Sequence, residues 1–239
     1  MFRKILIVAL LTAFIVSLTV TVMHVAEEEA MAETSTQARE VVRGMVSTYG
    51  GGDGVDFDAI RAAFGNDEIV AHLYVHGTNI DYFVVQTSDN DFYLYHDIWK
   101  NSSGAGWIFL DYAASLEGGN HNWVIYGHNM QRDHKFHSIS RFRDPSFFRE
   151  HNKITLTLEH GVTEWEIFSF YSSTIAFNYT QPDFPTDEAW AEMLNTFADL
   201  SRHMSNVGEL TAQDRILTLS TCTNTERDER FVVHARLIS

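Results

Sequence analysis

The stretch TLSTCTNTERDERFVVHARL, residues 218–237, decides how this chain folds because it joins two apolar runs through one polar loop. The first run, residues 216–221, ends at Cys222, and the second, residues 231–237, is preceded by Arg230. Runs rich in Val, Ile and Thr that are bounded by polar turns are typical of β-strands. The C-terminal part therefore predicts two strands, with Cys222 at the end of one and Arg230 just before the next.

Six stretches upstream have the same β character, which gives about eight strands in all. These six are Ile69 to Val75, Tyr82 to Val85, Trp107 to Leu110, Trp123 to Tyr126, Ile154 to Leu158 and Trp165 to Tyr171. Because each parallel crossover would need a helix, eight strands with few helices between them favour a mostly antiparallel, closed or nearly closed sheet. The sequence predicts a mostly β fold, a β-barrel in one domain.

Three helices are expected around this sheet. Residues 34–49 place apolar side chains at helical spacing and end at three glycines, and residues 57–64 form a shorter helix. Residues 186–204 carry six apolar side chains on one face, with Asp187 and Glu188 in the first turn to complement the helix dipole. This helix lies between the sixth and seventh strands, and we expect it to pack on the β body.

The N-terminal segment predicts a membrane anchor. After Arg3 and Lys4 the chain runs from residue 5 to residue 23 without a charge, which at about 1.5 Å per residue just crosses a hydrocarbon core of roughly 30 Å. The basic residues before it and the acidic residues after it favour a single-pass topology with the main body outside the cell. A cleaved signal peptide is the alternative, because Ala30-Met31-Ala32 resembles a cleavage site.

The chain is therefore divided into four segments. These are a cytoplasmic tail (1–4), a transmembrane signal-anchor (5–23), a juxtamembrane linker (24–33) and an extracellular domain (34–239).

Composition restricts the partners and the redox chemistry. The formal net charge of −15, with scattered basic residues, argues against nucleic acid, because phosphate would meet an unfavourable field. Cys222 is the one cysteine in 239 residues, so no internal disulfide can form. In an exported protein a leftover thiol indicates pairing between molecules or a reactive group, while burial as a small core residue is the alternative.

Two residues in the sequence are placed to support a reactive Cys222. If the last two strands are neighbours, the loop returns Arg230 to Cys222, where a cation favours the thiolate and can hold an oxyanion. Arg227 is a weaker candidate, and for either arginine a salt bridge to a loop carboxylate is the alternative. His128 follows a predicted strand in YGHNM and so lies at a strand exit, as Cys222 does. A histidine can give and take a proton near neutrality, as a cysteine nucleophile requires.

A metal site is a further alternative, since four histidines fall within 17 residues: His121, His128, His134 and His137. Established zinc sites have tighter spacing and a supporting carboxylate, and the sequence contains no HExxH pattern. We therefore expect no metal. The histidine inside the last strand, His234, is expected to be satisfied by packing or by a neighbouring group.

The motifs TLSTC (Thr218 to Cys222), Arg230 eight positions later and YGHNM (Tyr126 to Met130) resemble those of the sortases, specifically class B. The resemblance continues through residues 77–97 and 108–112 and covers nearly everything from residue 34 to residue 239. It implies an eight-stranded sortase β-barrel with N-terminal helices and a helix between strands six and seven. It also implies a membrane-anchored cysteine transpeptidase on the surface of a Gram-positive bacterium.

The resemblance also implies roles and partners. Cys222 becomes the nucleophile, His128 the general acid and base, and Arg230 the oxyanion and positioning group. Asn90, Leu94 and Ser220 match class B substrate-binding positions, although Leu94 is equally well placed for the core. The implied substrates are secreted proteins with a C-terminal sorting signal, NPxTN-like in most class B members. The implied acceptor is an amine of a lipid II-like cell-wall peptidoglycan precursor, with no cofactor, no metal and no nucleic acid.

Two other functions stay open on the sequence alone. A cysteine peptidase that hydrolyses its substrate would use the same thioester with water as the acceptor. A non-catalytic module of the same fold would bind peptides without forming a thioester.

Overall fold

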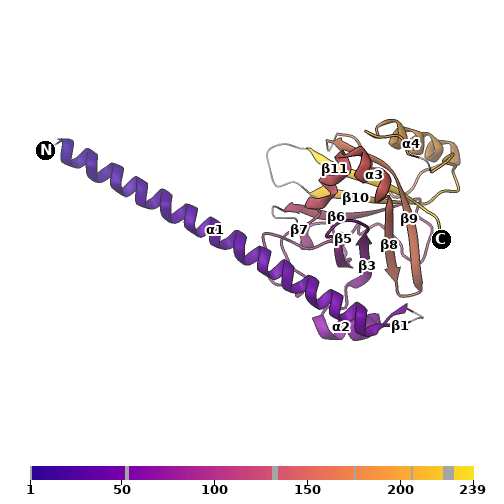
Figure 1. The fold of residues 1–239 in the computed structure, drawn as a ribbon, viewed down its shortest axis with the longest axis horizontal. Coiled ribbons are helices and arrows are strands. Elements are labelled where there is room, and N and C mark those ends of the chain that lie inside the picture. Colours follow the sequence, from indigo (N-terminus) through magenta and orange to yellow (C-terminus); the bar gives the residue numbers. More distant parts are fainter. Residues whose placement is uncertain (1, 52–53, 131–133, 175, 206, 223–228) are drawn as a thin grey trace.

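The computed structural model describes residues 2–51, 54–130, 134–174, 176–205, 207–222 and 229–239 of the chain. Its longest element is α1 (Phe2–Tyr49), whose N-terminal half projects far from the rest of the molecule (Figure 1). The segments expected as an anchor, a linker and a first helix thus form one continuous helix. Ala38 and Val42, near its C-terminal end, are buried against the domain.

Eight strands of the described chain close into a barrel, which confirms the predicted fold. The order around the barrel is β10, β11, β9, β8, β3, β4, β5 and β6, and β6 pairs again with β10. The strands are β3 (Ile69–Val75), β4 (Asp81–Val85), β5 (Phe109–Leu110), β6 (Asn122–Met130), β8 (Lys153–Leu158), β9 (Gly161–Ser173), β10 (Ile216–Cys222) and β11 (Arg230–Leu237).

Two of the barrel's strand pairs are parallel, β4 with β5 and β6 with β10, and the others are antiparallel. All eight predicted strands are present, and three differ clearly in length. The sixth, β9, extends beyond both ends of the predicted Trp165 to Tyr171. The third is only two residues long, because the backbone N–H of Trp107 donates to the carbonyl of Tyr93 (2.8 Å) and not to a neighbouring strand. β6 continues beyond Tyr126 because its pairing with β10 runs on to His128.

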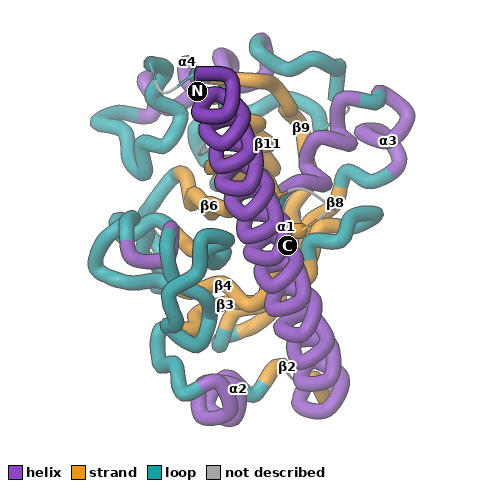
Figure 2. The backbone as a smooth tube through the Cα atoms, turned by 90° about the vertical axis from the view of Figure 1, so that its left-hand side faces the viewer, coloured by secondary structure: helices purple, strands orange, loops and turns teal. Residues whose placement is uncertain are grey.

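Several short helices and strands lie outside the barrel. α2 (Phe57–Phe64) begins where the Asp56 carboxylate accepts from the N–H of Ala59 (3.0 Å), and it ends at Gly65 in the left-handed conformation (φ 61°). Figure 2 shows α2 and β2 near the C-terminal end of α1, with the barrel strands behind that helix. The other small elements are β1 (Gly50–Gly51), β2 (Gly54–Val55), η1 (Phe92–Leu94), β7 (His134–Lys135), η2 (His137–Arg143) and α3 (Pro145–Glu150).

The helix expected over residues 186–204 is α4 (Asp187–Asp199), which lies between the sixth and seventh strands of the barrel as predicted. Its start is as expected, with the Thr186 hydroxyl accepting from the N–H of Ala189 (3.2 Å). The predicted end was wrong by five residues. After Leu200 the chain leaves the helix because the N–H of Arg202 donates to Phe170 in β9 (2.9 Å).

The core has two parts. The larger part fills the barrel and extends under α1 and α2. The smaller part lies between α4 and the outer face of the barrel and consists of Phe168, Tyr171, Tyr179, Trp190, Leu194, Phe197, Val207, Ile216 and Val232. α4 packs on one face of the barrel. The site described next lies elsewhere, at the end of the β6–β10 pairing.

Candidate active site

The parallel pairing of β6 and β10 brings His128 and Cys222 together. The two residues are register partners at the last pair of this ladder, although 94 positions separate them in the chain. Neighbouring strands lie about 4.8 Å apart, so the two backbones are adjacent. The sequence placed His128 at a strand exit, whereas it lies inside β6, opposite the final residue of β10. The side chain of Cys222 and residues 223–228, including Arg227, lie outside the described part of the chain.

Arg230 joins the same end of the barrel from β11. The antiparallel pairs of β10 and β11 run to Ser220 and Val232, and two residues further along each strand lead to Cys222 and Arg230. The Arg230 guanidinium donates from Nη1 to the carbonyl of Thr221 (3.1 Å). The three residues expected from distant parts of the sequence therefore meet on three adjacent strands.

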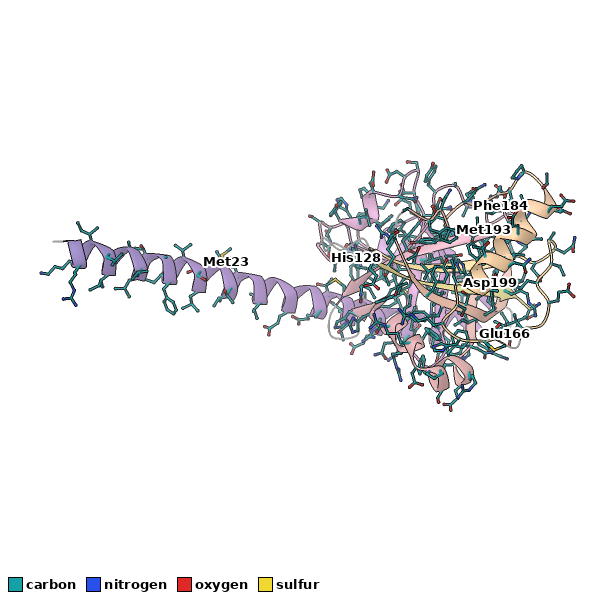
Figure 3. The ribbon with its side chains drawn as sticks, turned by 90° about the horizontal axis from the view of Figure 1, so that it is seen from above. Met23, His128, Glu166, Phe184, Met193 and Asp199 are labelled. Carbon is teal, nitrogen blue, oxygen red and sulfur yellow. The ribbon has the colours of Figure 1, made fainter. Side chains whose placement is uncertain are left out.

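His128 is buried, with 3% of its surface exposed, and one hydrogen bond fixes its imidazole. Its Nε2 lies 3.0 Å from the carbonyl oxygen of Leu94. A carbonyl can only accept, so Nε2 carries the proton of the neutral ring. Nδ1 is therefore the nitrogen of the neutral ring that can accept a proton. In Figure 3 His128 lies on the side of the domain from which α1 projects, far from Met193 and Asp199 of α4.

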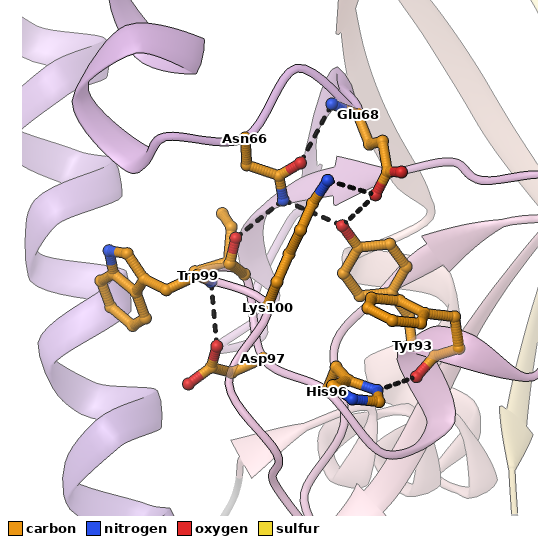
Figure 4. Close-up of polar contacts among 9 residues, drawn as sticks. Asn66, Glu68, Tyr93, His96, Asp97, Trp99 and Lys100 are labelled. Atoms are coloured by element: carbon orange, nitrogen blue, oxygen red, sulfur yellow. Dashed lines mark hydrogen bonds and ion pairs between the residues drawn. The ribbon is translucent and has the colours of Figure 1, made fainter.

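A polar network holds the loop that carries the Leu94 carbonyl (Figure 4). The Tyr93 hydroxyl donates to Glu68 (2.6 Å) and accepts from the Asn66 amide (2.9 Å), which also donates to the carbonyl of Ile98 (2.7 Å). Lys100 forms an ion pair with the same Glu68 oxygen (3.2 Å). Each side chain of this network comes from the domain itself, so the acceptor for His128 is positioned before any substrate binds.

The electrostatics of the site disfavour the imidazolium. Burial is the main cause that lowers the pKa of His128 below its usual value, and the hydrogen bond to Leu94 opposes this shift. The positive charges of Lys135 and Arg230 lower the pKa further. At neutral pH the ring is therefore mostly neutral, and its protonated form is a minority.

Asn90, Leu94 and Ser220, the proposed substrate-binding residues, have other partners in the structure. The Asn90 side chain donates to Asp111 (2.9 Å) and accepts from the N–H of Tyr112 (3.0 Å). Ser220 is fully buried on β10, and its hydroxyl is 2.9 Å from the Tyr179 hydroxyl.

Asn90 and Leu94 are nevertheless tied to the strand that carries His128. The Tyr126 hydroxyl donates to the same Asp111 oxygen as Asn90 (2.9 Å), and Tyr126 is two residues before His128. The Leu94 side chain packs against the core, while its carbonyl binds His128. The sequence indicated Leu94 as a substrate residue, and its backbone contact with His128 became visible only in the structure.

The four histidines considered for a metal site have separate partners. His121 pairs with Asp183 (3.6 Å), and His137 is 3.0 Å from the Asn129 side chain. Within the described ranges, no group of three or more His, Cys, Asp and Glu side chains gathers at metal-binding distance. His234 lies between the hydroxyls of Thr218 (2.8 Å) and Tyr171 (2.9 Å), as expected for a histidine satisfied by its neighbours.

Two further residues at the site gave no signal in the sequence. Gly106 has a left-handed backbone (φ 53°), and a Cβ there would lie 2.9 Å from Cδ2 of His128. Lys135 is buried close to the imidazole and contributes to its electrostatics. A glycine in GAGW and a lysine in a polar stretch are both ordinary in loops, so neither stands out without coordinates.

A cysteine, a histidine with one exchangeable nitrogen and an arginine on adjacent strands can perform acyl transfer. The cysteine supplies a nucleophile, the histidine carries a proton, and the guanidinium neutralises negative charge on a carbonyl oxygen. The site lies where the pairing of β6 with β10 ends.

Comparison with known proteins gives consistent matches. Residues 73–238 match the family model described as the sortase domain. The chain is 36% identical over 179 residues to sortase B of Listeria monocytogenes, covering 73% of this chain and 71% of the relative.

Solved structures give the same result for the fold. A Staphylococcus aureus sortase B–substrate complex superposes with a TM-score of 0.81 at 28% identity, covering 90% of this chain and 99% of that one. A structure of sortase B complexed with triglycine gives a TM-score of 0.80 at 28% identity, with coverage of 88% and 98%.

Proposed function

This chain belongs to the sortase family, in class B, and on that premise we propose that it is a membrane-anchored transpeptidase that joins secreted proteins to the cell wall. Sortases are cysteine transpeptidases, and the finer assignments of residues, substrate and location are proposals. The observation that carries them is the register pair of His128 and Cys222, with Arg230 bound to the residue before the cysteine.

In the proposed first step, the Cys222 thiolate attacks the carbonyl carbon of the threonine in an NPxTN-like sorting motif. A C–S bond forms, and Arg230 neutralises the charge on the carbonyl oxygen. The C–N bond then breaks, and the leaving amine takes the Nδ1 proton of the His128 imidazolium, the minority form in which both ring nitrogens carry a proton. The products are a thioester on Cys222, a neutral imidazole and a released C-terminal peptide.

In the second step, an amine of a lipid II-like cell-wall precursor attacks the thioester carbonyl. Nδ1 of His128 accepts the proton of this amine, the C–S bond breaks, and the thiolate is restored with a new amide bond. The triglycine complex of the related sortase B supports a glycine-type amine as the acceptor. The related sortase B of Staphylococcus aureus is known as a substrate complex, which supports a substrate-binding role for this chain as well.

Asn90, Leu94 and Ser220 are proposed to line the peptide site. Asn90 keeps one amide hydrogen beyond its bond to Asp111, because a side-chain amide has two donors. Leu94 is half-buried, and its carbonyl lies on the imidazole while its side chain packs against the core. Ser220 is two residues before the nucleophile on the same strand, where it shapes the floor through Tyr179.

The proposed location is the cell membrane, with the catalytic domain outside. Residues 3–23 of α1 have a mean hydropathy of 2.7, and none of this window is buried in the domain. A helix of this length and composition is able to cross a membrane, and a signal sequence meets the same criterion. The proposal keeps the four-segment division of the chain, with residues 24–33 connecting as helix.

A test of the function uses the full chain in detergent with a labelled NPxTN-type peptide and triglycine. Cys222→Ala is expected to reduce cleavage to the uncatalysed level, while the unsubstituted chain yields a thioester visible as added mass on Cys222. Met204→Ala is the control, because that side chain is 95% exposed and lies away from the site.

The products separate the alternatives. A triglycine adduct supports the transpeptidase, and a hydrolysed peptide whose yield does not respond to triglycine supports a peptidase. Peptide binding without a thioester supports a non-catalytic module. Cleavage that persists in Cys222→Ala would contradict all assignments of the nucleophile.

A further inference from the structure

Lys135 is a buried lysine that takes no part in the proposed formation of the thioester or in its reaction with the acceptor amine. It lies in the short strand β7, which pairs with the end of β6, and only 1% of its surface is exposed. Lysines are almost never fully buried unless a partner compensates the charge. Its backbone is also in the left-handed region (φ 54°), which is uncommon for a residue other than glycine. A residue held in this way needs an explanation.

Aromatic rings enclose the ammonium group. Nζ lies 3.5 Å from the centroid of the Trp107 indole and 5.4 Å from that of the Tyr82 ring. The two rings meet edge to face at 5.7 Å and 86°. A cation over an aromatic face is attracted by the ring quadrupole, and the attraction grows when water is excluded. The N–H of Lys135 also donates to the Tyr82 hydroxyl (3.1 Å), so both ends of the residue are fastened to the barrel.

The Trp107 loop connects this cation to the imidazole. Gly106, the preceding residue, packs so closely that an added Cβ would lie 2.7 Å from the Leu94 oxygen and 2.9 Å from Cδ2 of His128. Trp107 itself is fixed, because its indole N–H donates to the carbonyl of Phe83 (2.8 Å). A second connection runs along the backbone, where the N–H of Phe136 donates to the carbonyl of His128 (3.0 Å).

We propose that Lys135 is a positioning residue for His128: its ammonium is held on Trp107, next to the Gly106 backbone that packs against the imidazole and its Leu94 acceptor, and it adds a positive charge to this end of the barrel. This inference rests on the proposed function, because it concerns the proton carrier of that reaction. A nearby cation opposes a second positive charge on the imidazole and favours a thiolate. Lys135 thereby shifts the balance of protonation states without touching the substrate.

Other charges also act on these groups. His128 is affected by Lys135 from β7 and by Arg230 from β11, and it faces Cys222 on β10. Lys135 is affected by Asp97, which favours its charged form, and by Arg39 on α1, which opposes it. Burial lowers the pKa of Lys135 well below its usual value, and the negative charge of Asp97 opposes this shift.

The test measures the imidazole directly, in the absence of substrate. The full chain in detergent, with ¹³C-labelled histidine and Cys222→Ala to remove the thiol, is titrated by NMR with and without Lys135→Met. Methionine fills a similar volume without charge, and we expect the pKa of His128 to rise. Lys153→Met is the matched control, since it removes a charge from an exposed position on β8, a strand that does not pair with β6. It is expected to leave the pKa of His128 unchanged.

Two results would overturn the inference. One is a His128 pKa that rises no more in Lys135→Met than in Lys153→Met. The other, measured on the chain with Lys135 intact, is an ε-carbon signal showing that the amine of Lys135 is neutral at pH 7. In the active chain, Lys135→Met is expected to shift the pH profile of kcat to higher pH. If Lys135 only fills space, the pH profile would not shift. If the titration shifts and no peptide is cleaved, the proposed function fails and the inference about the imidazole stands.

Discussion

Two buried histidines, His128 at the rim and His234 in the core, show how one barrel treats the same side chain differently. Both have a pKa lowered mainly by burial. His234 has a partner on each ring nitrogen and stacks on Phe197 with centroids 3.8 Å apart. Thr218 donates to Asn122 (2.6 Å) and so accepts from Nδ1 of His234, which leaves Nε2 to accept from Tyr171. No nitrogen of this ring is left for chemistry.

His128 differs in two ways. Its described hydrogen bond uses Nε2 and leaves Nδ1 available, and its backbone is paired with that of Cys222 at the end of β10. Burial therefore does not distinguish a structural histidine from a proton carrier. The distinction lies in the second nitrogen and in the position along the strand.

The largest effect expected from this comparison is on catalysis. His128→Gln keeps an amide N–H that can donate to Leu94 but removes the exchangeable nitrogen, so kcat is expected to fall by about 10²–10⁴-fold. The free energy of unfolding in urea is expected to change little. His234→Gln is the matched control, and its turnover per folded molecule should stay close to that of the unsubstituted chain. Equal losses of turnover in both variants would remove the distinction.

The second effect is on stability and its pH dependence. His234→Gln replaces a ring with two fixed partners, and at pH 7 we expect a loss of about 1–3 kcal/mol of unfolding free energy. The folded pKa of His234 is about 3, whereas an unfolded histidine titrates near 6.5. Between these values the unfolded chain binds a proton that the folded chain does not, so stability falls as the pH is lowered.

This slope can be measured by urea unfolding at pH 7, 6 and 5. A single such histidine contributes up to about 1.4 kcal/mol per pH unit, and His234→Gln should lose that share. The same slope is measured in His128→Gln for comparison, because the pKa of His128 is also lowered in the folded chain. An unchanged slope in His234→Gln would mean that the core histidine is protonated in the folded state.

The smallest effect on turnover is expected at Gly106, which packs against the His128 imidazole. Gly106→Ala is expected to lower stability by about 1–3 kcal/mol, because its φ of 53° is strained for a side chain and the added Cβ would lie 2.5 Å from the Tyr93 carbonyl oxygen and 2.7 Å from that of Leu94. Since the added methyl would displace the Leu94 carbonyl or the imidazole, kcat should fall by about tenfold with KM little changed. Gly65→Ala is the control, with a similar φ of 61° and no heavy atom within 4 Å of an added Cβ. A loss of kcat in both variants would indicate general destabilisation.

Local pattern was sufficient for much of the fold. The eight strands follow from β-branched and aromatic runs, because side chains that suit a pleated, half-buried surface are specified over a few residues. The start of α4 follows from Thr186 and the acidic residues after it, which act on the backbone of one turn. The end of α4 was missed because a hydrogen bond from Arg202 to β9 stops the helix, and no local pattern records that bond.

The sequence by itself determined the residue types of the site, since only a cysteine, a histidine and an arginine in those motifs suit the proposed chemistry. Their meeting was decided by the tertiary structure, through the parallel pairing of β6 with β10 across 94 positions. The same holds for the surroundings of His128. There the Leu94 carbonyl acts through a hydrogen bond, Gly106 through close packing and Lys135 through its charge. Burial, hydrogen bonding and neighbouring charge set a pKa, and these depend on which strands and loops become neighbours in the folded chain.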